Sequence, residues 1–175
     1  MEDIENLCIV CFADASFGNL PTGASQGAYI IFLVDKTGRA NLISWQSRKL
    51  KRVCTSTLSA EALAAIEALN ASIFFRELLI EVLGVKNISL RALTDNKSLT
   101  DTIELLTVVE DKRLRIDIAS LRESIQNDYV EGLYWVPSAL NLANPLTKQG
   151  ASSTYLIDVL NHNMRFDFQS NIFKK

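Results

Sequence analysis

The chain has 175 residues, of which 48% are hydrophobic and 22% are charged, and its formal net charge is −2. This composition is typical of one globular domain and excludes both a collagen-like repeat and an intrinsically disordered chain. Because nucleic-acid binding through a uniformly basic surface goes with a domain pI above about 9, any such binding here must come from local clusters of charge. The longest apolar stretches, such as residues 7–13, are too short to span a bilayer, and no signal peptide opens the chain, so we expect an intracellular protein.

The first half of the chain predicts three strands followed by one long helix. An apolar run is followed by a turn-rich segment, and two further strand patterns flank a turn at residues 35–38. From Thr57 the pattern becomes helical, with no Gly or Pro before Gly84, and glycine is the residue that most often ends a helix. The predicted strands are residues 7–13, 28–34 and 40–45, and the predicted helix is 57–83.

The second half alternates short strands and helices. Three antiparallel strands, a crossover helix and two further parallel strands predict an α/β fold, in which a five-stranded mixed sheet is flanked by helices. We expect one domain over residues 1–160 and a C-terminal tail over residues 161–175. The predicted elements of this half are strand 88–94, helices 98–106 and 113–126, strand 131–136 and helix 154–160.

The three cysteines are an odd number, which in an intracellular setting predicts free thiols. Cys8 and Cys11 are three residues apart within the apolar run 7–13, and in a strand this odd offset directs the two side chains to opposite faces. No second cysteine pair and no histidine pair supplies further ligands. Core packing is therefore favoured over a metal or redox site.

Three acidic residues fall at positions that a metal site would require. Asp14 and Asp95 follow the first and fourth predicted strands, and Glu61 lies about one turn into the long helix, on the side of its alanine stripe. Three converging carboxylates repel one another, so they persist either protonated or around a cation. Oxygen ligands favour Mg²⁺ or Mn²⁺, and zinc is disfavoured because the only histidine, His162, lies near the end of the chain. With 20 acidic residues in the chain, a chance arrangement stays open on spacing alone.

Seven short sequence blocks occur in a fixed order along the chain, and their combination is far more specific than any one of them. They are FADAS (12–16), ISWQSRK (43–49), STLSAEA (56–62), LTDNKS (93–98), RIDI (115–118), YWVP (134–137) and LANPLTK (142–148). Together they resemble the ribonuclease H domain at the C-terminus of copia-type retrotransposon polyproteins. The resemblance extends from residue 7 to about residue 160.

The resemblance implies a ribonuclease H-like fold and a ribonuclease H that cleaves the RNA strand of an RNA·DNA hybrid with two Mg²⁺ ions, for which Mn²⁺ can substitute. Asp14 would bridge both ions, Glu61 and Asp95 would complete the second site, and position 144 would bind the ion that activates the attacking water. The implied partner is the reverse transcriptase domain of the same polyprotein, in a cytoplasmic virus-like particle or in the nucleus.

Position 144 departs from the family pattern, because Asn144 stands where the family usually has Asp. An amide oxygen can coordinate a hard cation, but the change removes one negative charge and a base, so metal affinity and rate should fall. An engineered change and a natural variant of a weak or retired enzyme both stay open. The rival function is a non-catalytic hybrid-binding or structural module. A two-metal DNA nuclease is a third interpretation, which the copia-like blocks disfavour.

Hybrid recognition would rest on local polar groups. Four cations lie in the five residues 48–52 and are candidate phosphate contacts, although a solvated loop is the alternative. Ser16 and Asn96 adjoin two of the acids and are candidate contacts to 2′-hydroxyls. For Trp45 and Trp135, buried packing in strands is favoured over stacking on bases. The four candidate cations are Arg48, Lys49, Lys51 and Arg52.

Overall fold

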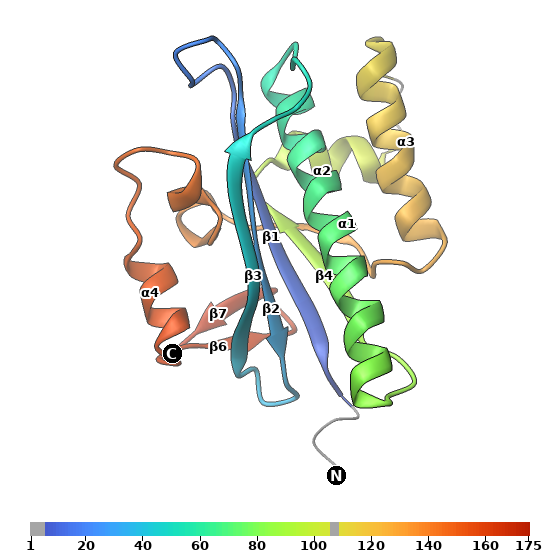
Figure 1. The fold of residues 1–175 in the computed structure, drawn as a ribbon, viewed down its shortest axis with the longest axis vertical. Coiled ribbons are helices and arrows are strands. Elements are labelled where there is room, and N and C mark those ends of the chain that lie inside the picture. Colours follow the sequence, from blue (N-terminus) through green and yellow to red (C-terminus); the bar gives the residue numbers. More distant parts are fainter. Residues whose placement is uncertain (1–5, 106–108) are drawn as a thin grey trace.

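The computed structural model describes residues 6–105 and 109–175 (Figure 1). Its strands are β1 (Cys8–Ser16), β2 (Gln26–Val34), β3 (Ala40–Lys49), β4 (Ser89–Thr94), β5 (Leu133–Trp135), β6 (Arg165–Asp167) and β7 (Ile172–Lys174). Its helices are α1 (Thr57–Leu83), α2 (Lys97–Glu104), α3 (Lys112–Gln126) and α4 (Thr154–Leu160), with short 3-10 helices at Ser138–Leu140 and Asn144–Leu146. Within the two described ranges, no helix combines the length and the apolar character needed to cross a membrane.

The first five strands form one mixed sheet in the order β3-β2-β1-β4-β5. Strand β2 is antiparallel to β1 and β3, whereas β4 runs parallel to both β1 and β5. A parallel pair needs a crossover connection, and α1 is part of the one that links β3 to β4. The predicted α/β fold with a five-stranded mixed sheet flanked by helices is therefore confirmed.

Side chains of β1 alternate between two core layers on opposite faces of the sheet. Ile9 and Cys11 belong to the cluster that includes residues of α1, α2 and α3, whereas Val10 and Phe12 belong to the cluster with α4 and the β6–β7 hairpin. Figure 1 shows α1 and α3 on one side of the sheet and α4 on the other. Cys8 lies in the second cluster, so it and Cys11 face opposite layers as free thiols, as their odd spacing predicted.

Helix α1 begins and ends at residues that its sequence signals. The Ser56 side chain accepts a hydrogen bond from the backbone N–H of Ser59 and completes a capping box with it, and Gly84 ends the helix at a φ of 64°. Its buried side is lined by small side chains that allow close packing on the sheet. Glu61 lies on this buried side, near the N-terminal end of the helix.

Three sequence predictions differ from the structure in detail. Strand β5 is shorter than the predicted residues 131–136, and α2 ends at Glu104, while residue 106 of the predicted helix lies outside the described residues. Trp45 and Trp135 are 60% and 48% exposed, so the expectation of buried packing was wrong. Trp45 lies on β3 and Trp135 lies on β5. These are the two edge strands of the sheet, where fewer neighbours cover a large side chain.

The segment expected as a tail, residues 161–175, packs on the domain through the β6–β7 hairpin. Phe173 is buried, and its ring centroid lies 6.2 Å from that of Phe12, 5.8 Å from that of Phe32 and 5.2 Å from that of Phe166. The Arg91 side chain also donates to the backbone oxygen of residue 168 at 2.8 Å. Apolar burial therefore holds this segment against the sheet, and the domain boundary at residue 160 stays a prediction.

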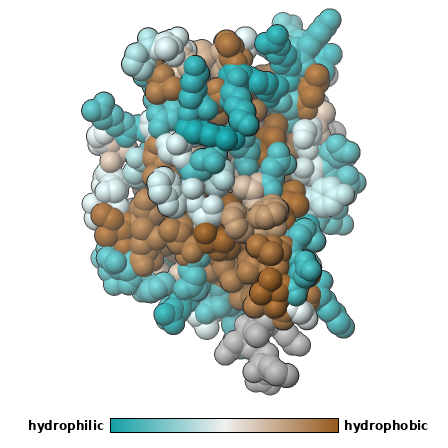
Figure 2. Space-filling model, in the orientation of Figure 1, coloured by the Kyte–Doolittle hydropathy of each residue, from teal (hydrophilic) through white to brown (hydrophobic). Residues whose placement is uncertain are grey.

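Exposed apolar side chains also gather on the outer side of α1. Phe74, Leu78 and Val82 follow one another at a spacing of four residues and are 63%, 43% and 70% exposed. Figure 2 shows hydrophobic surface over the lower part of the molecule, where the C-terminal half of α1 lies, and mostly hydrophilic surface at the upper end. In Figure 1, β1 and β4 both run toward this hydrophilic end.

We expect Phe173→Ala to lower the free energy of unfolding by about 3 to 5 kcal/mol, because it leaves a cavity among buried rings. Urea unfolding followed by circular dichroism measures the change. Phe74→Ala is the matched control, since this ring is 63% exposed, and its expected effect is below about 1 kcal/mol. Equal losses in the two variants would contradict a stabilising role for the hairpin.

Candidate active site

The three acids that the sequence singles out converge at one end of the sheet. Asp14 lies in β1, which extends to Ser16 and so further than predicted, and Asp95 directly follows β4. Because β1 and β4 are parallel and Ala13 pairs with Thr94, their acidic residues lie side by side. Helix α1 adds Glu61, and one carboxylate oxygen of each acid lies within 4.8 Å of the others.

Burial and mutual repulsion dominate the electrostatics of this cluster. Asp14 is 0% exposed and Glu61 is 5% exposed. Burial, together with the nearby charges of Asp14 and Asp95, raises the pKa of Glu61 to about 9. Burial also raises the pKa of Asp14, although the hydrogen bond from Thr147 and the charge of Lys148 partly offset this.

The donor set fits a hard divalent cation. Glu61 Oε2 is buried and has no hydrogen-bond partner among the described residues. The Glu61 side chain faces two other carboxylates, which cannot donate a hydrogen bond to it when they are ionised. A buried, unpaired carboxylate oxygen carries a desolvation cost that an oxygen-coordinated cation would remove. Asp14, Glu61 and Asp95 therefore have the chemistry to hold Mg²⁺ or Mn²⁺.

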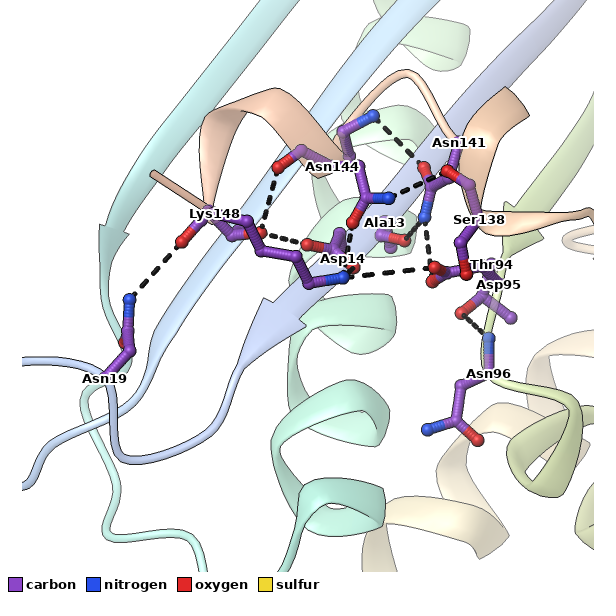
Figure 3. Close-up of polar contacts among 12 residues, drawn as sticks. Ala13, Asp14, Asn19, Thr94, Asp95, Asn96, Ser138, Asn141, Asn144 and Lys148 are labelled. Atoms are coloured by element: carbon purple, nitrogen blue, oxygen red, sulfur yellow. Dashed lines mark hydrogen bonds and ion pairs between the residues drawn. The ribbon is translucent and has the colours of Figure 1, made fainter. Parts of the chain in front are cut away.

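Asn144 lies beside the cluster and is linked to it through a lysine. Its side-chain Nδ2 donates to the backbone oxygen of Ser138 at 2.7 Å, which turns Oδ1 toward Lys148 (Figure 3). Lys148 Nζ donates to Asn144 Oδ1 and to Asp14 Oδ1, the latter at 3.1 Å, and lies 4.0 Å from Asp95 Oδ2. Lys148 thus joins the amide of Asn144 to the carboxylate of Asp14, and a role of Asn144 as a metal ligand stays a prediction.

Three residues that the sequence does not mark as site residues contact the acids. Asn141 is buried and donates from Nδ2 to Asp95 Oδ1 at 3.1 Å and to the backbone oxygen of residue 13 at 3.0 Å. The Thr147 hydroxyl donates to Asp14 Oδ2, and Lys148 contacts Asp14 as described. Thr147 and Lys148 end the seventh sequence block, but no spacing rule links them to an acid more than 130 residues earlier.

Strands β2 and β3 hold the segment that carries these residues. The backbone oxygen of Leu146 accepts hydrogen bonds from Gln26 Nε2 at 3.0 Å and from Ser47 Oγ at 2.6 Å. Asn19 Nδ2 donates to the backbone oxygen of Thr147 at 3.3 Å. The segment 144–148 is therefore fixed to the sheet independently of the acids.

The four candidate phosphate-binding residues differ in how far their charges are already paired within the chain. Arg48 pairs with Glu67 at 3.2 Å, and Arg52 Nη2 donates to both carboxylate oxygens of the buried Asp117, at 2.6 and 2.7 Å. Part of the hydrogen-bond donors of both arginines therefore already bind carboxylates of this chain. By contrast, the lysines of the same segment, Lys49 and Lys51, are exposed.

The two small polar candidates lie at the same end of the sheet as the acids. Ser16 ends β1 and is partly exposed. Asn96 caps α2, because its Oδ1 accepts a hydrogen bond from the backbone N–H of Leu99 at 2.9 Å. Contacts of either residue to a 2′-hydroxyl stay a prediction.

Glu61 should make the metal-free protein less stable as the pH rises. In the unfolded chain its pKa is near 4.5, and in the folded chain it is about 9, so the folded state holds the extra proton. This contribution to stability is complete below about pH 4.5 and is lost as the pH rises toward 9.

Urea unfolding in EDTA at pH 5, 6.5 and 8 measures this effect, and we expect Glu61→Gln to flatten the decline. Glu81→Gln, which changes an exposed glutamate of the same helix, should follow the wild type. Parallel pH profiles for wild type and Glu61→Gln would refute the assignment of this loss to Glu61.

Comparisons with known proteins place the fold. No protein-family description matches the chain, and no curated protein matches its sequence. Among solved structures, the ribonuclease H1 LC11, isolated from compost by a metagenomic approach, matches with a TM-score of 0.58 at 14% identity over 82% of this chain and 95% of that protein. The N-terminal RNase H domain of Rv2228c from Mycobacterium tuberculosis gives 0.57 at 16% identity over 82% and 98%.

A third structure agrees with these two. RNase H1 from the halophilic archaeon Halobacterium salinarum matches with a TM-score of 0.52 at 16% identity over 86% of this chain and 98% of that protein. The chain therefore has a ribonuclease H-like fold.

Proposed function

We propose that the chain is a metal-dependent ribonuclease H that hydrolyses the RNA strand of RNA·DNA hybrids. The observation that carries this proposal is the convergence of Asp14, Glu61 and Asp95 within 4.8 Å, with a buried Glu61 oxygen that lacks a partner among the described residues. A neighbour in fold supports the substrate class, since LC11-RNase H1 has been solved in complex with an RNA/DNA hybrid and matches with a TM-score of 0.57 at 18% identity.

The proposed mechanism assigns each acid a task. Asp14, the most buried, would contact both ions, Glu61 and Asp95 would hold one of them, and Asn144 would offer Oδ1 to the other. Divalent ions, when bound, supply a water of lowered pKa and neutralise the leaving 3′ oxygen. Asn141 holds the Asp95 carboxylate by a 3.1 Å hydrogen bond and so orients it. Asn144 cannot accept a proton at neutral pH, so it cannot act as a base.

The type of genetic element from which the domain comes is inferred from the seven sequence blocks. They support a copia-type retrotransposon polyprotein, in which the domain would work beside the reverse transcriptase domain during reverse transcription. A cytoplasmic virus-like particle, or the nucleus, is the location that goes with this origin. The proposed ribonuclease H-like unit is residues 1–160, of which residues 1–5 and 106–108 lie outside the described structure.

The second candidate function is a hybrid-binding or structural module without catalysis. Asn144 favours it, because this residue removes one of the four negative charges that the family pattern places around the metals. Lys148 lowers the negative charge of the cluster further. A hybrid-binding module would share its ligand with the nuclease, and neither form of this second candidate would cut the hybrid.

Cleavage of a labelled RNA·DNA hybrid in Mg²⁺ and in Mn²⁺ separates the two candidates. We expect Asn144→Asp to cut about tenfold faster or more, because a carboxylate holds the ion more tightly than an amide does. Adding Asp14→Asn to the Asn144→Asp variant should abolish cleavage, since Asp14 is the most buried of the three acids that would hold the ions. If only the Asn144→Asp variant cuts, the chain is an inactivated form; if neither this variant nor the wild type cuts, the nuclease proposal is wrong.

Hybrid binding should depend on the exposed lysines of the basic segment. We expect Lys51→Ala to weaken binding and to reduce the slope of log K against log salt by about 1, because one phosphate contact is lost. Fluorescence anisotropy at several salt concentrations measures the slope. Lys86→Ala is the matched control, since this exposed lysine follows the other end of α1. The same slope in wild type and Lys51→Ala would remove Lys51 from the interface.

A further inference from the structure

Lys148 places a positive charge within the acid cluster. Its ammonium donates to Asp14 Oδ1 at 3.1 Å and to Asn144 Oδ1, and it lies 4.0 Å from Asp95 Oδ2 (Figure 3). Asp14 is fully buried, and the Asp95 side chain is 6% exposed. A buried carboxylate without a counter-charge is costly, so an ammonium at this distance contributes directly to the stability of the cluster.

The ammonium contacts the same oxygens that the proposed function gives to metal ions. Asp14 and Asn144 each offer Oδ1 to Lys148, and a side-chain oxygen that accepts from lysine is less available to a cation. Glu61 Oε2 is left without a partner among the described residues, so the lysine satisfies one side of the cluster only. The lysine and a divalent ion would therefore compete for part of the donor set.

We propose that Lys148 is a built-in counter-cation that offsets part of the negative charge of the cluster in the metal-free protein and competes with divalent ions for Asp14 and Asn144. This inference rests on the proposed metal-dependent function. The Lys148 side chain is 41% exposed and has a flexible four-carbon stem, so its ammonium can move to solvent without a change in the backbone. Metal binding then includes the displacement of Lys148, which lowers the observed affinity.

A purely structural role for Lys148 makes the opposite prediction. If the lysine only fastened segment 144–148, its loss would loosen Asn144 and weaken metal binding. However, Gln26 and Ser47 already hold the backbone oxygen of Leu146 in this segment. The segment should therefore keep its place without the ammonium, and removal of the charge should strengthen metal binding.

Mn²⁺ binding without nucleic acid, followed by electron paramagnetic resonance of the free ion, tests the competition. We expect Lys148→Gln and Lys148→Met to bind Mn²⁺ about tenfold more tightly than wild type, because a positive charge 3.1 Å from Asp14 Oδ1 and 4.0 Å from Asp95 Oδ2 is removed. Lys148→Arg keeps the charge and should stay near wild type. Lys97→Gln removes an equal charge from an exposed side chain two residues after Asp95, and we expect less than a twofold change.

Thermal unfolding adds a readout of opposite sign. In EDTA the Lys148→Gln variant should melt at a lower temperature than wild type, whereas saturating Mn²⁺ should raise its melting temperature by more than it raises that of wild type. If Lys148→Gln and Lys148→Met bind Mn²⁺ no more tightly than a wild type that still binds it, the proposed role of Lys148 is wrong, whereas the metal-dependent function stands. Equal tightening in Lys97→Gln would also overturn the role of Lys148, since charge at any nearby position would then suffice. A lack of Mn²⁺ binding in every variant, Asn144→Asp included, would overturn the metal-dependent function as well.

Discussion

Three carboxylates that share a buried space repel one another, and the site depends on how this repulsion is balanced. Oxygens of Asp14, Glu61 and Asp95 lie within 4.8 Å of one another, with little solvent to screen them. Two features reduce this repulsion. The pKa of Glu61 is raised to about 9, so this side chain can stay protonated, and the ammonium of Lys148 lies close to the other two acids. A divalent cation would balance the charge more completely, because it would also reach the Glu61 oxygen that has no partner among the described residues.

The fold can hold this arrangement because each acid comes from an element with its own apolar support. Strand β1 is buried on both faces, β4 is its parallel neighbour, and α1 packs on both through small side chains, so hydrophobic free energy offsets the electrostatic cost at one end of the sheet. The segment 144–148 is held in turn by β2 and β3. Its Asn144 and Lys148 both shift the local charge in the positive direction compared with a site of four acids and no lysine contact. Together, Asn144 and Lys148 should weaken the binding of divalent cations and allow the acid cluster to persist when no cation is bound.

Up to residue 160, the sequence by itself determined the order and type of the main strands and helices, because alternating and helical apolar patterns are local signals. It also singled out the three acids that converge in the structure, since Asp14, Glu61 and Asp95 stand in recognisable blocks at strand ends and on a helix. Their convergence followed from the parallel pairing of β1 and β4, which the crossover helix predicts. The exposure of Trp45 and Trp135 was not foreseen, because an edge position is a property of the whole sheet.

Only the tertiary structure decided how the cluster is completed and what the last fifteen residues do. Contacts from Asn141, Thr147 and Lys148 to the acids join segments far apart in the chain, and no periodicity encodes such a pairing. The same holds for the β6–β7 hairpin, whose phenylalanines are buried against β1 and β2 although their sequence resembles a polar tail. Local patterns report which face of an element is apolar, but the partner that covers that face, or the charge that meets an acid, is chosen by the packing of the whole chain.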